Sequence, residues 1–377
     1  MIYCKKCLTT DLRPNALFYD QICIACQFSD VEASETFNVK LNILKDKIKK
    51  TKQNKKSDYD CIIGVSGGKD SSRQAHWVRD RLGLRPLLVC GAYPPRQMSQ
   101  VGANNLSNLI KMGFDLIVAT PAPQSASHLS LESFIKFGNI AKSTEMSLFS
   151  TVPRLAIELG INTIFWGENP ALQVGDSAVE GNDPFDGNSL RNLNTLTDGG
   201  NSWIHDCLAK KHLQDHYIYP EKLEFDKKHI NIFYLGPAWD DWSNDNNALY
   251  AALQGLELRP GEESITGDIS NASMLDEQFI HINFMLKYYK YGFGLATDFI
   301  NQRIRAQIIS RDEGIKIVEQ FDGVCSEEII KDYCMYVGIT SIDFWNIANK
   351  WTNKKLFNIQ KGKRPIKKFK VGTDYAC

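Results

Sequence analysis

The stretch of sequence that decides the fold is CIIGVSGGKDS, residues 61–71. It begins as a short apolar run, passes through two adjacent glycines, and leads into a helical pattern from Ser71 to about Leu82. Glycine lets the backbone turn tightly and, having no Cβ, lets an anion approach the main chain. The first turn of a helix presents unpaired N–H groups and the positive end of the helix dipole. The stretch therefore predicts a phosphate-binding turn between a buried strand and a helix.

The side chains of this turn suit a nucleotide phosphate and its magnesium ion. Ser66 and Ser71 offer hydroxyl donors, and Lys69 offers a positive charge. Asp70 offers a carboxylate that can hold Mg²⁺ against phosphate oxygens. The glycine spacing excludes both the Walker loop and the G-x-G-x-x-G fingerprint. The residues predicted to bind ATP in this turn are Ser66, Gly67, Gly68, Lys69, Asp70 and Ser71.

Strand and helix signals alternate after this turn. Strands are predicted at 87–90, 115–119, 163–166 and 231–235, and helices at 104–112, 129–137 and 146–159. Repeated strand–helix–strand order predicts a doubly wound parallel sheet, whose ligands lie at the carboxyl ends of the strands. We therefore expect an α/β fold of the PP-loop or HUP type, with a small N-terminal zinc ribbon and a helical C-terminal region.

Composition divides the chain into predicted regions. These are a zinc ribbon at 1–30, a linker helix at 31–57, an ATP-binding domain at 58–245 and a helical region at 246–377. Seven lysines between Lys45 and Lys56 indicate a solvated face of the linker helix. Residues 171–230 are polar and weakly periodic, which is typical of a functional loop. The basic tail at 361–370 is expected to be mobile.

Four of the ten cysteines lie within the first 26 residues, as two Cys-x2-Cys pairs separated by fifteen residues. Each pair turns two thiolates toward one point, and the intervening loop lets both pairs meet at a tetrahedral ion. Thiolates match zinc in softness, although an iron–sulfur cluster accepts the same ligands. We predict a closed, structural zinc site, with a cluster as the alternative. The predicted ligands are Cys4, Cys7, Cys23 and Cys26.

Charge and hydropathy exclude several classes of protein. The 377 residues carry 44 Lys and Arg against 44 Asp and Glu, so the formal net charge is zero. Nucleic-acid-binding proteins usually need a basic surplus, and no apolar run reaches the roughly 18–20 residues that span a bilayer. The amino terminus has no apolar signal-peptide core, and clustered cysteines are unlike a secreted disulfide scaffold. We expect a cytoplasmic protein that binds neither nucleic acid nor membrane.

Ser66 to Ser71 resemble the SGGxDS signature of the PP-loop ATP pyrophosphatases, which include NAD synthetase, asparagine synthetase and tRNA-thiolating enzymes. The resemblance implies that the turn holds the β,γ-pyrophosphate of ATP and that ATP is cleaved to AMP and pyrophosphate. It assigns Lys69 and Asp70 to catalysis, and Asp70 to Mg²⁺ as well. AMP transfer to an amide oxygen makes that oxygen a good leaving group, while donors around pyrophosphate stabilise the departing charge.

Over nearly its whole length the chain is similar to the N-acetyl sugar amidotransferases of the WbpG/PseA type, from lipopolysaccharide O-antigen and flagellin-glycan biosynthesis. The stretches that point to this family are Gly167-Glu168-Asn169 and Lys290-Tyr291-Gly292-Phe293-Gly294. The resemblance implies conversion of a sugar acetamido group to an acetamidino group, on a nucleotide-linked or free acetamido sugar. ATP would adenylate the amide oxygen, ammonia would attack the imidate carbon, and AMP would leave.

Glu168 and Asn169 close the strand predicted at 163–166, at the edge of the sheet where ligands bind. We predict that Glu168 is catalytic and that Asn169 binds the cofactor, so that the pair touches ATP, magnesium or the sugar. The alternative is that both residues only hold the next loop.

Two further groups of polar and aromatic residues are candidates. Lys290, Asp298 and Arg305 can face phosphates or a sugar carboxylate, although the aromatic and glycine spacing around them equally describes helix packing. Trp239 and Trp242 flank two aspartates after a predicted strand, and tryptophan can stack on a sugar ring. The alternative for both tryptophans is a place in the core.

The ammonia source is predicted from what the sequence lacks. Residue 2 is isoleucine, whereas an amino-terminal nucleophile glutaminase exposes a cysteine after the initiator methionine, and no cysteine sits in the Gly-x-Cys-x-Gly elbow of a triad glutaminase. We expect a separate glutaminase partner, and the resemblance implies a HisH-like glutaminase with a HisF-like ammonia-channel protein. The alternatives are a tRNA-thiolating enzyme, which typically needs a cysteine such as Cys61 or Cys90 near ATP, and an ATP-sensing module.

Overall fold

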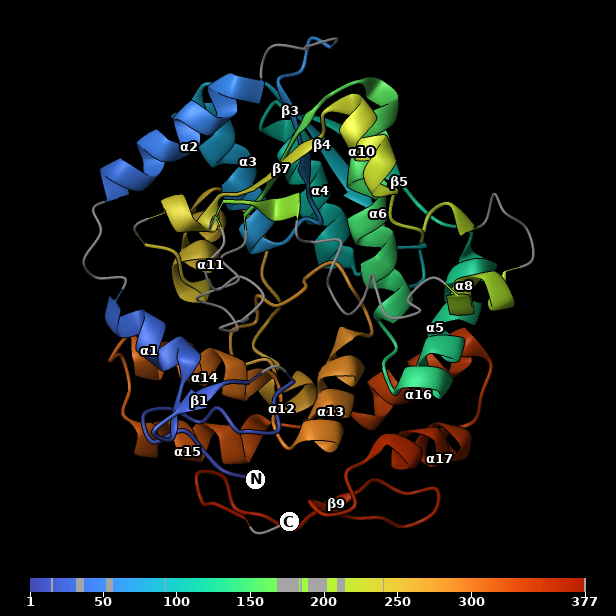
Figure 1. The fold of residues 1–377 in the computed structure, drawn as a ribbon. Coiled ribbons are helices and arrows are strands. Elements are labelled where there is room, and N and C mark those ends of the chain that lie inside the picture. The colour runs from blue at the N-terminus through green and yellow to red at the C-terminus, as the bar shows by residue number, and fades with distance from the viewer. Residues whose placement is uncertain are drawn as a thin grey trace.

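The computed structural model describes residues 1–14, 16–31, 37–51, 57–91, 93–167, 183, 185–188, 202–208, 214–239 and 241–375. Figure 1 shows an upper part built around a sheet and a lower part built of helices, with the two chain ends close together at the bottom. Among the described residues, no helix combines the length and the apolar character needed to cross a membrane.

A five-stranded parallel sheet forms the centre of the upper part. Its strands are β3 (Cys61–Gly64), β4 (Pro86–Gly91), β5 (Asp115–Ala119), β6 (Thr163–Trp166) and β7 (Asn231–Tyr234). Their order across the sheet is β5-β4-β3-β6-β7. The chain runs outward from β3 to one edge and then returns to build the other half from β6. The switch point, where α/β sheets bind ligands, therefore lies between β3 and β6.

Both faces of this sheet are covered by helices. Ile63 and Phe165 pack toward one face and Ile62 and Ile164 toward the other, as the two-residue period of a strand requires. The first face is covered by α2 (Phe37–Thr51), α3 (Lys69–Leu82) and α4 (Gln100–Lys111). The second is covered by α5 (Pro123–Phe137), α6 (Lys142–Leu159), α8 (Ser202–Cys207) and α10 (Lys222–Lys228). The predicted doubly wound α/β fold is confirmed.

Local signals explain where the elements begin and end. The strands predicted at 115–119 and 163–166 match β5 and β6 residue for residue. α4 begins earlier than predicted because its cap precedes the apolar pattern: the Ser99 hydroxyl accepts the Gly102 N–H at 2.9 Å. The stretch 171–230 contains α8 and α10 among its described residues, so it is less irregular than predicted.

The lower part is an assembly of short helices around an aromatic core. Its helices are α12 (Glu263–Thr266), α13 (Ile280–Tyr291), α14 (Leu295–Arg305), α15 (Arg311–Phe321), α16 (Glu327–Val337) and α17 (Ser341–Trp351). Tyr333 and Phe344 meet in this core with ring centroids 6.2 Å apart. Ser310 and Glu313 form a capping box at the start of α15. A separate helix, α11 (Asn244–Leu253), packs against α3 of the upper part.

The basic tail at 361–370 is packed rather than mobile, so that prediction was wrong. Phe369 is 5% exposed and Val371 is 3% exposed, and both belong to the aromatic core. The short strands β8 (Phe357–Asn358) and β9 (Ile366–Lys367) pair antiparallel beside them. The lysines suggested a solvated tail, but the apolar residues between them supply enough buried surface to hold it in place.

The N-terminal ribbon lies on the lower part, far along the chain from the residues that it contacts (Figure 1). It contains β1 (Phe18–Tyr19), β2 (Ile22–Cys23) and α1 (Ile24–Val31). The Leu8 N–H donates to Asn301 Oδ1 of α14 at 2.7 Å. The Tyr3 N–H donates to the Asp374 carboxylate at 2.8 Å. The ribbon and the last residues of the chain thus form one packed unit.

Candidate functional site

The predicted turn connects β3 to α3 and is held from below by α4. Gly67 has φ +81°, a backbone conformation that glycine adopts readily. A Cβ at Gly67 would lie 3.0 Å from the Gly102 carbonyl oxygen and 3.1 Å from Asn105 Cβ. Gly68 is the N-cap residue of α3 and brings no side-chain acceptor to the first N–H groups of the helix. One glycine therefore turns the chain, and the other leaves the helix start open to an anion.

The turn borders a cavity of about 230 Å³ at the switch point of the sheet. The turn and the start of α3 contribute Ser66, Gly68, Lys69, Asp70 and Ser71. The strand ends and α6 contribute Gly64, Tyr93, Leu148 and Trp166, and a loop before α13 contributes Ala272, Met274 and Asp276. The predicted ATP-binding residues of the turn are thereby brought together, while Gly67 shapes the turn from behind.

Asp70, the predicted magnesium ligand, is held from two sides. One carboxylate oxygen contacts the Lys69 ammonium group, which is buried. The other accepts Asn247 Nδ2 of α11 at 2.6 Å. Asn247 Oδ1 in turn accepts Arg73 Nη1 at 2.7 Å. Arg73 thus reaches Asp70 only through a neutral amide, and Lys69 is the cation that contacts the carboxylate directly.

The two tryptophans considered for sugar stacking are core residues. Trp239 is buried, and the Arg73 guanidinium lies 4.7 Å from its ring centroid. Trp242 is also buried and donates its Nε1–H to the Gly167 carbonyl oxygen at 3.1 Å. Asp240, between them in the sequence, lies outside the described residues. The tryptophans support the site from behind, so the core alternative is the one that the structure favours.

Glu168 and Asn169 lie outside the described residues, and their predicted roles remain predictions. Gly167, directly before them, is described and lies against the start of α3. A Cβ at Gly167 would lie 2.7 Å from Gln74 Oε1 and 3.4 Å from the Asp70 carbonyl oxygen. The chain therefore leaves β6 in close contact with the helix that carries the predicted catalytic residues.

Sequence reasoning missed Asp276, which closes the cavity from the C-terminal region. It is 4% exposed, and the hydroxyls of Tyr93 and Ser66 stabilise the charged form of its carboxylate. Burial outweighs this stabilisation and raises the pKa of Asp276 to about 6. Gly102 makes room for it, since a Cβ there would lie 2.4 Å from Asp276 Cα. A signal existed: residues 274–280, MLDEQFI, place two acids inside an apolar run.

The four cysteines of the ribbon meet as predicted, and all are buried with their sulfurs within 4.8 Å of one another. Cys4 Sγ lies 4.0 Å from Cys26 Sγ, and Cys7 Sγ lies 3.6 Å from Cys23 Sγ. Zn–S bonds of about 2.3 Å in a tetrahedron would separate the sulfurs by roughly 3.8 Å. In a cubane cluster the thiolates bind different irons, which spaces the sulfurs more widely. The donor set and its spacing fit a single zinc ion.

Comparison with known protein families gives a match in the C-terminal region. Residues 275–370 match the family described as LPS biosynthesis protein WbpG-like, C-terminal domain. After this match we call residues 275–370 the WbpG-like domain. The resemblance to WbpG-type proteins is thereby confirmed for this region. The WbpG-like domain includes Asp276, so it supplies one wall of the cavity whose other wall is the phosphate-binding turn.

Two other comparisons were made. Among solved structures, the U34-tRNA thiolase NcsA from Methanococcus maripaludis with its [4Fe-4S] cluster matches at 12% sequence identity and a TM-score of 0.30, covering 90% of this chain and 98% of that chain. A likeness at this TM-score carries no argument about fold or function. No curated protein matches the chain.

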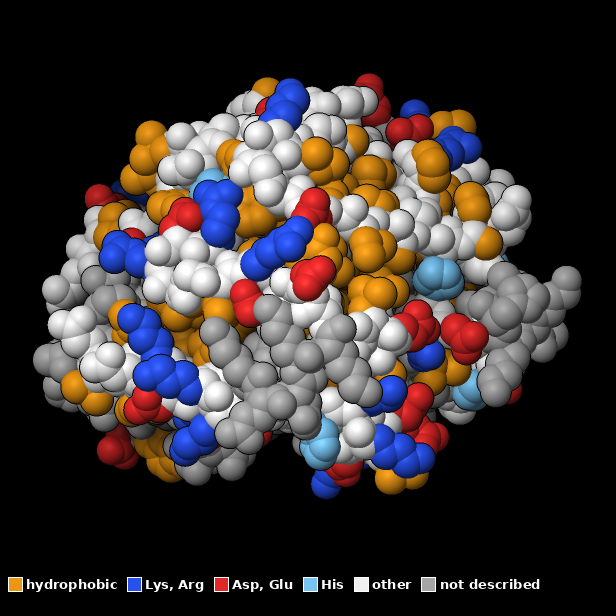
Figure 2. All heavy atoms as spheres, turned by 90° about the horizontal axis from the view of Figure 1, so that it is seen from above, with side chains coloured by type: hydrophobic (Ala, Val, Ile, Leu, Met, Phe, Trp, Pro, Cys, Tyr) orange, Lys and Arg blue, Asp and Glu red, His pale blue; other side chains and the backbone are white. Residues whose placement is uncertain are grey.

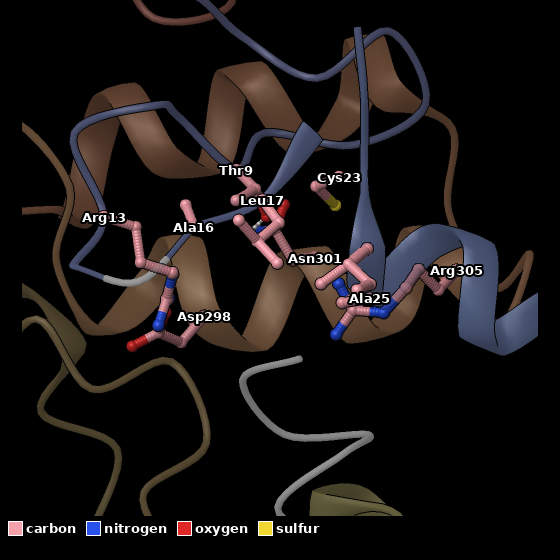
Figure 3. A pocket seen from close by; sticks show the side chains of 10 residues that line it. Thr9, Arg13, Ala16, Leu17, Cys23, Ala25, Asp298, Asn301 and Arg305 are labelled. Atoms are coloured by element: carbon pink, nitrogen blue, oxygen red, sulfur yellow. Dashed lines mark hydrogen bonds and ion pairs between the residues drawn. The ribbon is translucent and has the colours of Figure 1, made fainter. Parts of the chain in front are cut away.

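The polar candidates inside the WbpG-like domain lie away from this cavity. Asp298 pairs with Arg13 of the ribbon and with Lys287, and Figure 3 shows Arg13 and Asp298 pointing toward each other. Burial disfavours the charge on Asp298, but Arg13 and Lys287 outweigh it and hold the pKa of this carboxyl below its usual range. Lys290 donates to a backbone carbonyl of α5 at 2.8 Å, and Arg305 borders a small cavity beside the ribbon. In the described structure these residues join the ribbon and α5 to the WbpG-like domain.

Proposed function

We propose that this chain is an ATP-dependent amidotransferase that converts a sugar acetamido group to an acetamidino group, with AMP and pyrophosphate as by-products. The observation that carries the proposal is one cavity with two walls: the Ser66–Ser71 turn faces Asp276 of the WbpG-like domain. A turn suited to ATP and a domain type known from lipopolysaccharide biosynthesis thus meet at the switch point of the sheet. The acceptor would be a nucleotide-linked or free acetamido sugar.

The turn can hold the pyrophosphate end of ATP with its main chain. The N–H groups that follow Gly68 would donate to phosphate oxygens, and the buried Lys69 ammonium group would balance their charge. Asp70 would hold Mg²⁺, which neutralises phosphate charge when bound. By analogy with oxyanion donors, each well-placed N–H is worth about 2.7–4 kcal/mol to the transition state.

The proposed chemistry explains why ATP is required. An amide carbon resists attack by nitrogen because its oxygen is a poor leaving group. Attack of the amide oxygen on the α-phosphorus releases pyrophosphate and makes that oxygen part of AMP. Ammonia then forms the new C–N bond, and the C–O bond to AMP breaks. We propose that a HisH-like glutaminase and a HisF-like channel protein deliver the ammonia, and that Glu168 and Asn169 contact the reacting groups.

The second candidate function, tRNA thiolation, is disfavoured by the cysteines. No cysteine lines the cavity in the part of the chain that the structure describes. Cys61 and Cys90 are both buried in the sheet, and burial raises the pKa of the Cys90 thiol, so that its reactive thiolate is suppressed. The face seen in Figure 2 carries acidic and basic side chains side by side, without the broad basic field that an RNA partner favours.

The test is product analysis with purified protein, ATP, Mg²⁺ and ammonium chloride. A panel of UDP-linked and free acetamido and diacetamido sugars is incubated with the protein and examined by mass spectrometry. We expect one product lighter by the difference between O and NH, together with AMP and pyrophosphate. The Ser66→Ala/Asp70→Asn double variant is expected to lose the product, and Cys61→Ala and Cys90→Ala to keep it. Release of ADP and orthophosphate would overturn the proposal.

A further inference from the structure

Asp276 belongs to a loop that is built to hold one shape. The Asp268 carboxylate accepts the N–H of Ser270 at 3.0 Å and the N–H of Ser273 at 3.0 Å. From the other side, the Arg259 guanidinium donates to the carbonyl oxygens of Ser273 and Met274, and of Glu277 at 3.1 Å. Arg259 is itself buried, with its pKa lowered by that burial. Buried donors and acceptors satisfied in this way rigidify the segment that they connect.

This loop presents one carboxylate to the ATP cavity and keeps its neighbour out. Asp276 lines the cavity, whereas Glu277 does not, although the two are buried to the same extent, at 4% and 3% exposure. Gly102 of α4 fixes the backbone of Asp276 by close contact. The backbone that carries the Asp276 carboxylate is therefore held by contacts from three segments.

The Asp276 carboxylate can accept further hydrogen bonds. An ionised carboxylate offers about four lone-pair sites, and the donors that stabilise its charge are its own backbone N–H and the Tyr93 and Ser66 hydroxyls. The remaining capacity adjoins a cavity that also receives the Lys69 and Asp70 side chains. A proton donor that enters this cavity would meet a fixed acceptor opposite the phosphate-binding turn.

The proposed amidotransferase reaction needs such an acceptor, because ammonia gains a positive charge as it forms the C–N bond. We propose that Asp276 is the general base of the amination step and takes the proton that the attacking ammonia must lose. This inference rests on the proposed function and deepens it. It assigns the amination step to the WbpG-like domain and the AMP-transfer step to the turn.

The step balances without any further reactant. The nitrogen lone pair of ammonia forms the bond to the imidate carbon, and one N–H proton passes to Asp276. The C–O bond then breaks, and its electron pair leaves on the AMP oxygen. The product is the protonated amidine, and Asp276 returns its proton to water as AMP departs.

The charge state of Asp276 at neutral pH suits this role. Burial raises the pKa of Asp276, and its own backbone N–H, the Tyr93 and Ser66 hydroxyls and the Arg259 guanidinium oppose that rise. The other titratable groups near it are Cys90 and Glu277, on which its charge acts, and Lys69 and Asp70, which line the same cavity. With a pKa near 6, Asp276 is mostly ionised at pH 7 and more basic than an exposed aspartate. A base with its pKa close to the working pH is the most effective one.

The experiment compares Asp276→Asn with the matched variant Glu277→Gln, in which the neighbouring buried acid is replaced by its amide. Burial raises the pKa of Glu277 to about 8, so this variant keeps the neutral form that Glu277 mostly has at pH 7. Single-turnover formation of pyrophosphate and of amidine is followed with ATP, Mg²⁺ and the sugar of the panel that wild-type protein converts. We expect Asp276→Asn to slow amination by about 10²–10⁴-fold, the usual contribution of a general base, and AMP transfer far less. Glu277→Gln is expected to keep both rates.

A pH profile separates a base from a residue that only supports Ser66. Plotted against the concentration of free NH₃, wild-type amination is expected to rise as pH passes about 6, and Asp276→Asn to lose this rise. Equal loss of both steps, or a raised KM for ATP with an unchanged amination rate, would overturn the assignment and leave a supporting role. Normal amination by Asp276→Asn overturns it too. Wild-type protein that forms neither AMP nor pyrophosphate overturns this inference together with the proposed function.

Discussion

The phosphate-binding turn and the cysteine ribbon are both tight clusters of small groups, but they are held together in different ways. At the turn, packing contacts fix the backbone: Gly67 lies against Gly102 and Asn105 of α4. In the ribbon, the sulfurs of Cys4, Cys7, Cys23 and Cys26 converge on one point and also accept backbone N–H groups, from Thr9 at 3.4 Å and from Cys23 at 3.3 Å. The turn is therefore shaped before its ligand arrives, whereas the ribbon is shaped by its ligand. A binding site and a structural site can be told apart by this criterion.

The largest effect on stability is expected from removing the metal-binding thiols of the ribbon. This change tests directly whether a bound metal ion shapes the ribbon. Structural zinc contributes about 10–16 kcal/mol to the folding of zinc-finger peptides at neutral pH. Cys7→Ser/Cys23→Ser is therefore expected to unfold residues 1–14 and uncover α14. Hydrogen exchange and metal analysis measure this, with the half-buried Cys207→Ser as the control. An unchanged exchange pattern in the double variant would refute the role of the metal.

The next effect concerns the support of Asp70. Asn247→Ala removes a buried amide that hydrogen-bonds two charged groups, Asp70 and Arg73, and leaves them with Lys69 and Asp241 as their remaining ion-pair partners. Hydrogen bonds to charged groups are worth about 1.5–3 kcal/mol, and we expect a loss of that size in urea unfolding together with weaker Mg²⁺ dependence of ATP binding. Asn246→Ala, at the exposed neighbouring position, is the control. Equal behaviour of the two variants would contradict the positioning role.

A third prediction concerns the shape of the turn itself. Gly67→Ala places a Cβ on a residue with φ +81°, which costs about 1–2 kcal/mol, and pushes the turn away from Gly102. ATP affinity is expected to fall at least about tenfold, because tenfold corresponds to 1.4 kcal/mol. Gly83→Ala carries the same strain, with φ +63°, but meets nothing within 4 Å. If calorimetry finds the same loss of ATP affinity for both, close packing of the turn is not what shapes the site.

The smallest effect on stability is expected from the ion pairs of Asp298, which join the ribbon to the WbpG-like domain. Arg13 and Lys287 lower the pKa of Asp298 against the effect of burial, so their contribution to stability is complete above the usual aspartate value of 3.8 and is lost as pH falls through the folded-state pKa. Ion pairs of this exposure contribute about 0.2–1 kcal/mol each. Asp298→Asn is expected to be less stable than wild type at pH 7 and equal to it in acid. Urea unfolding measures this, with the exposed Asp332→Asn as the control; a constant difference at all pH values would count against it.

The features that the sequence predicts are those that neighbouring residues decide. The turn at 66–71 and the strands at 115–119 and 163–166 carry their own glycine, capping and apolar signals, and the four cysteines carry their spacing. Asn247 carries none: it is one asparagine in a polar helix start, and it becomes important because folding brings it 2.6 Å from Asp70, which lies 177 residues earlier. The role of such a residue depends on long-range packing, which periodicity does not contain.

The same reasoning accounts for the wrong prediction about the tail and for the overlooked acid. Residues 361–370 have a lysine composition typical of a solvated segment, but Phe369 and Val371 bury themselves in a core contributed by distant helices. Asp276 looks like an ordinary polar residue until α4 and the turn enclose it. In both cases the residue types favour solvent, and packing against distant parts of the chain buries them instead.

The docking of the ribbon has a consequence for how the protein is made. Tyr3 bonds to Asp374, which the ribosome adds 371 residues later. At about 5–20 residues per second, the nascent ribbon waits roughly 20–70 s for that partner. During this interval a metal ion bound by the four cysteines would stabilise the ribbon, whereas the contacts with α14 and Asp374 have not yet formed. Capture of zinc during translation would therefore protect the four thiols from oxidation until synthesis is complete.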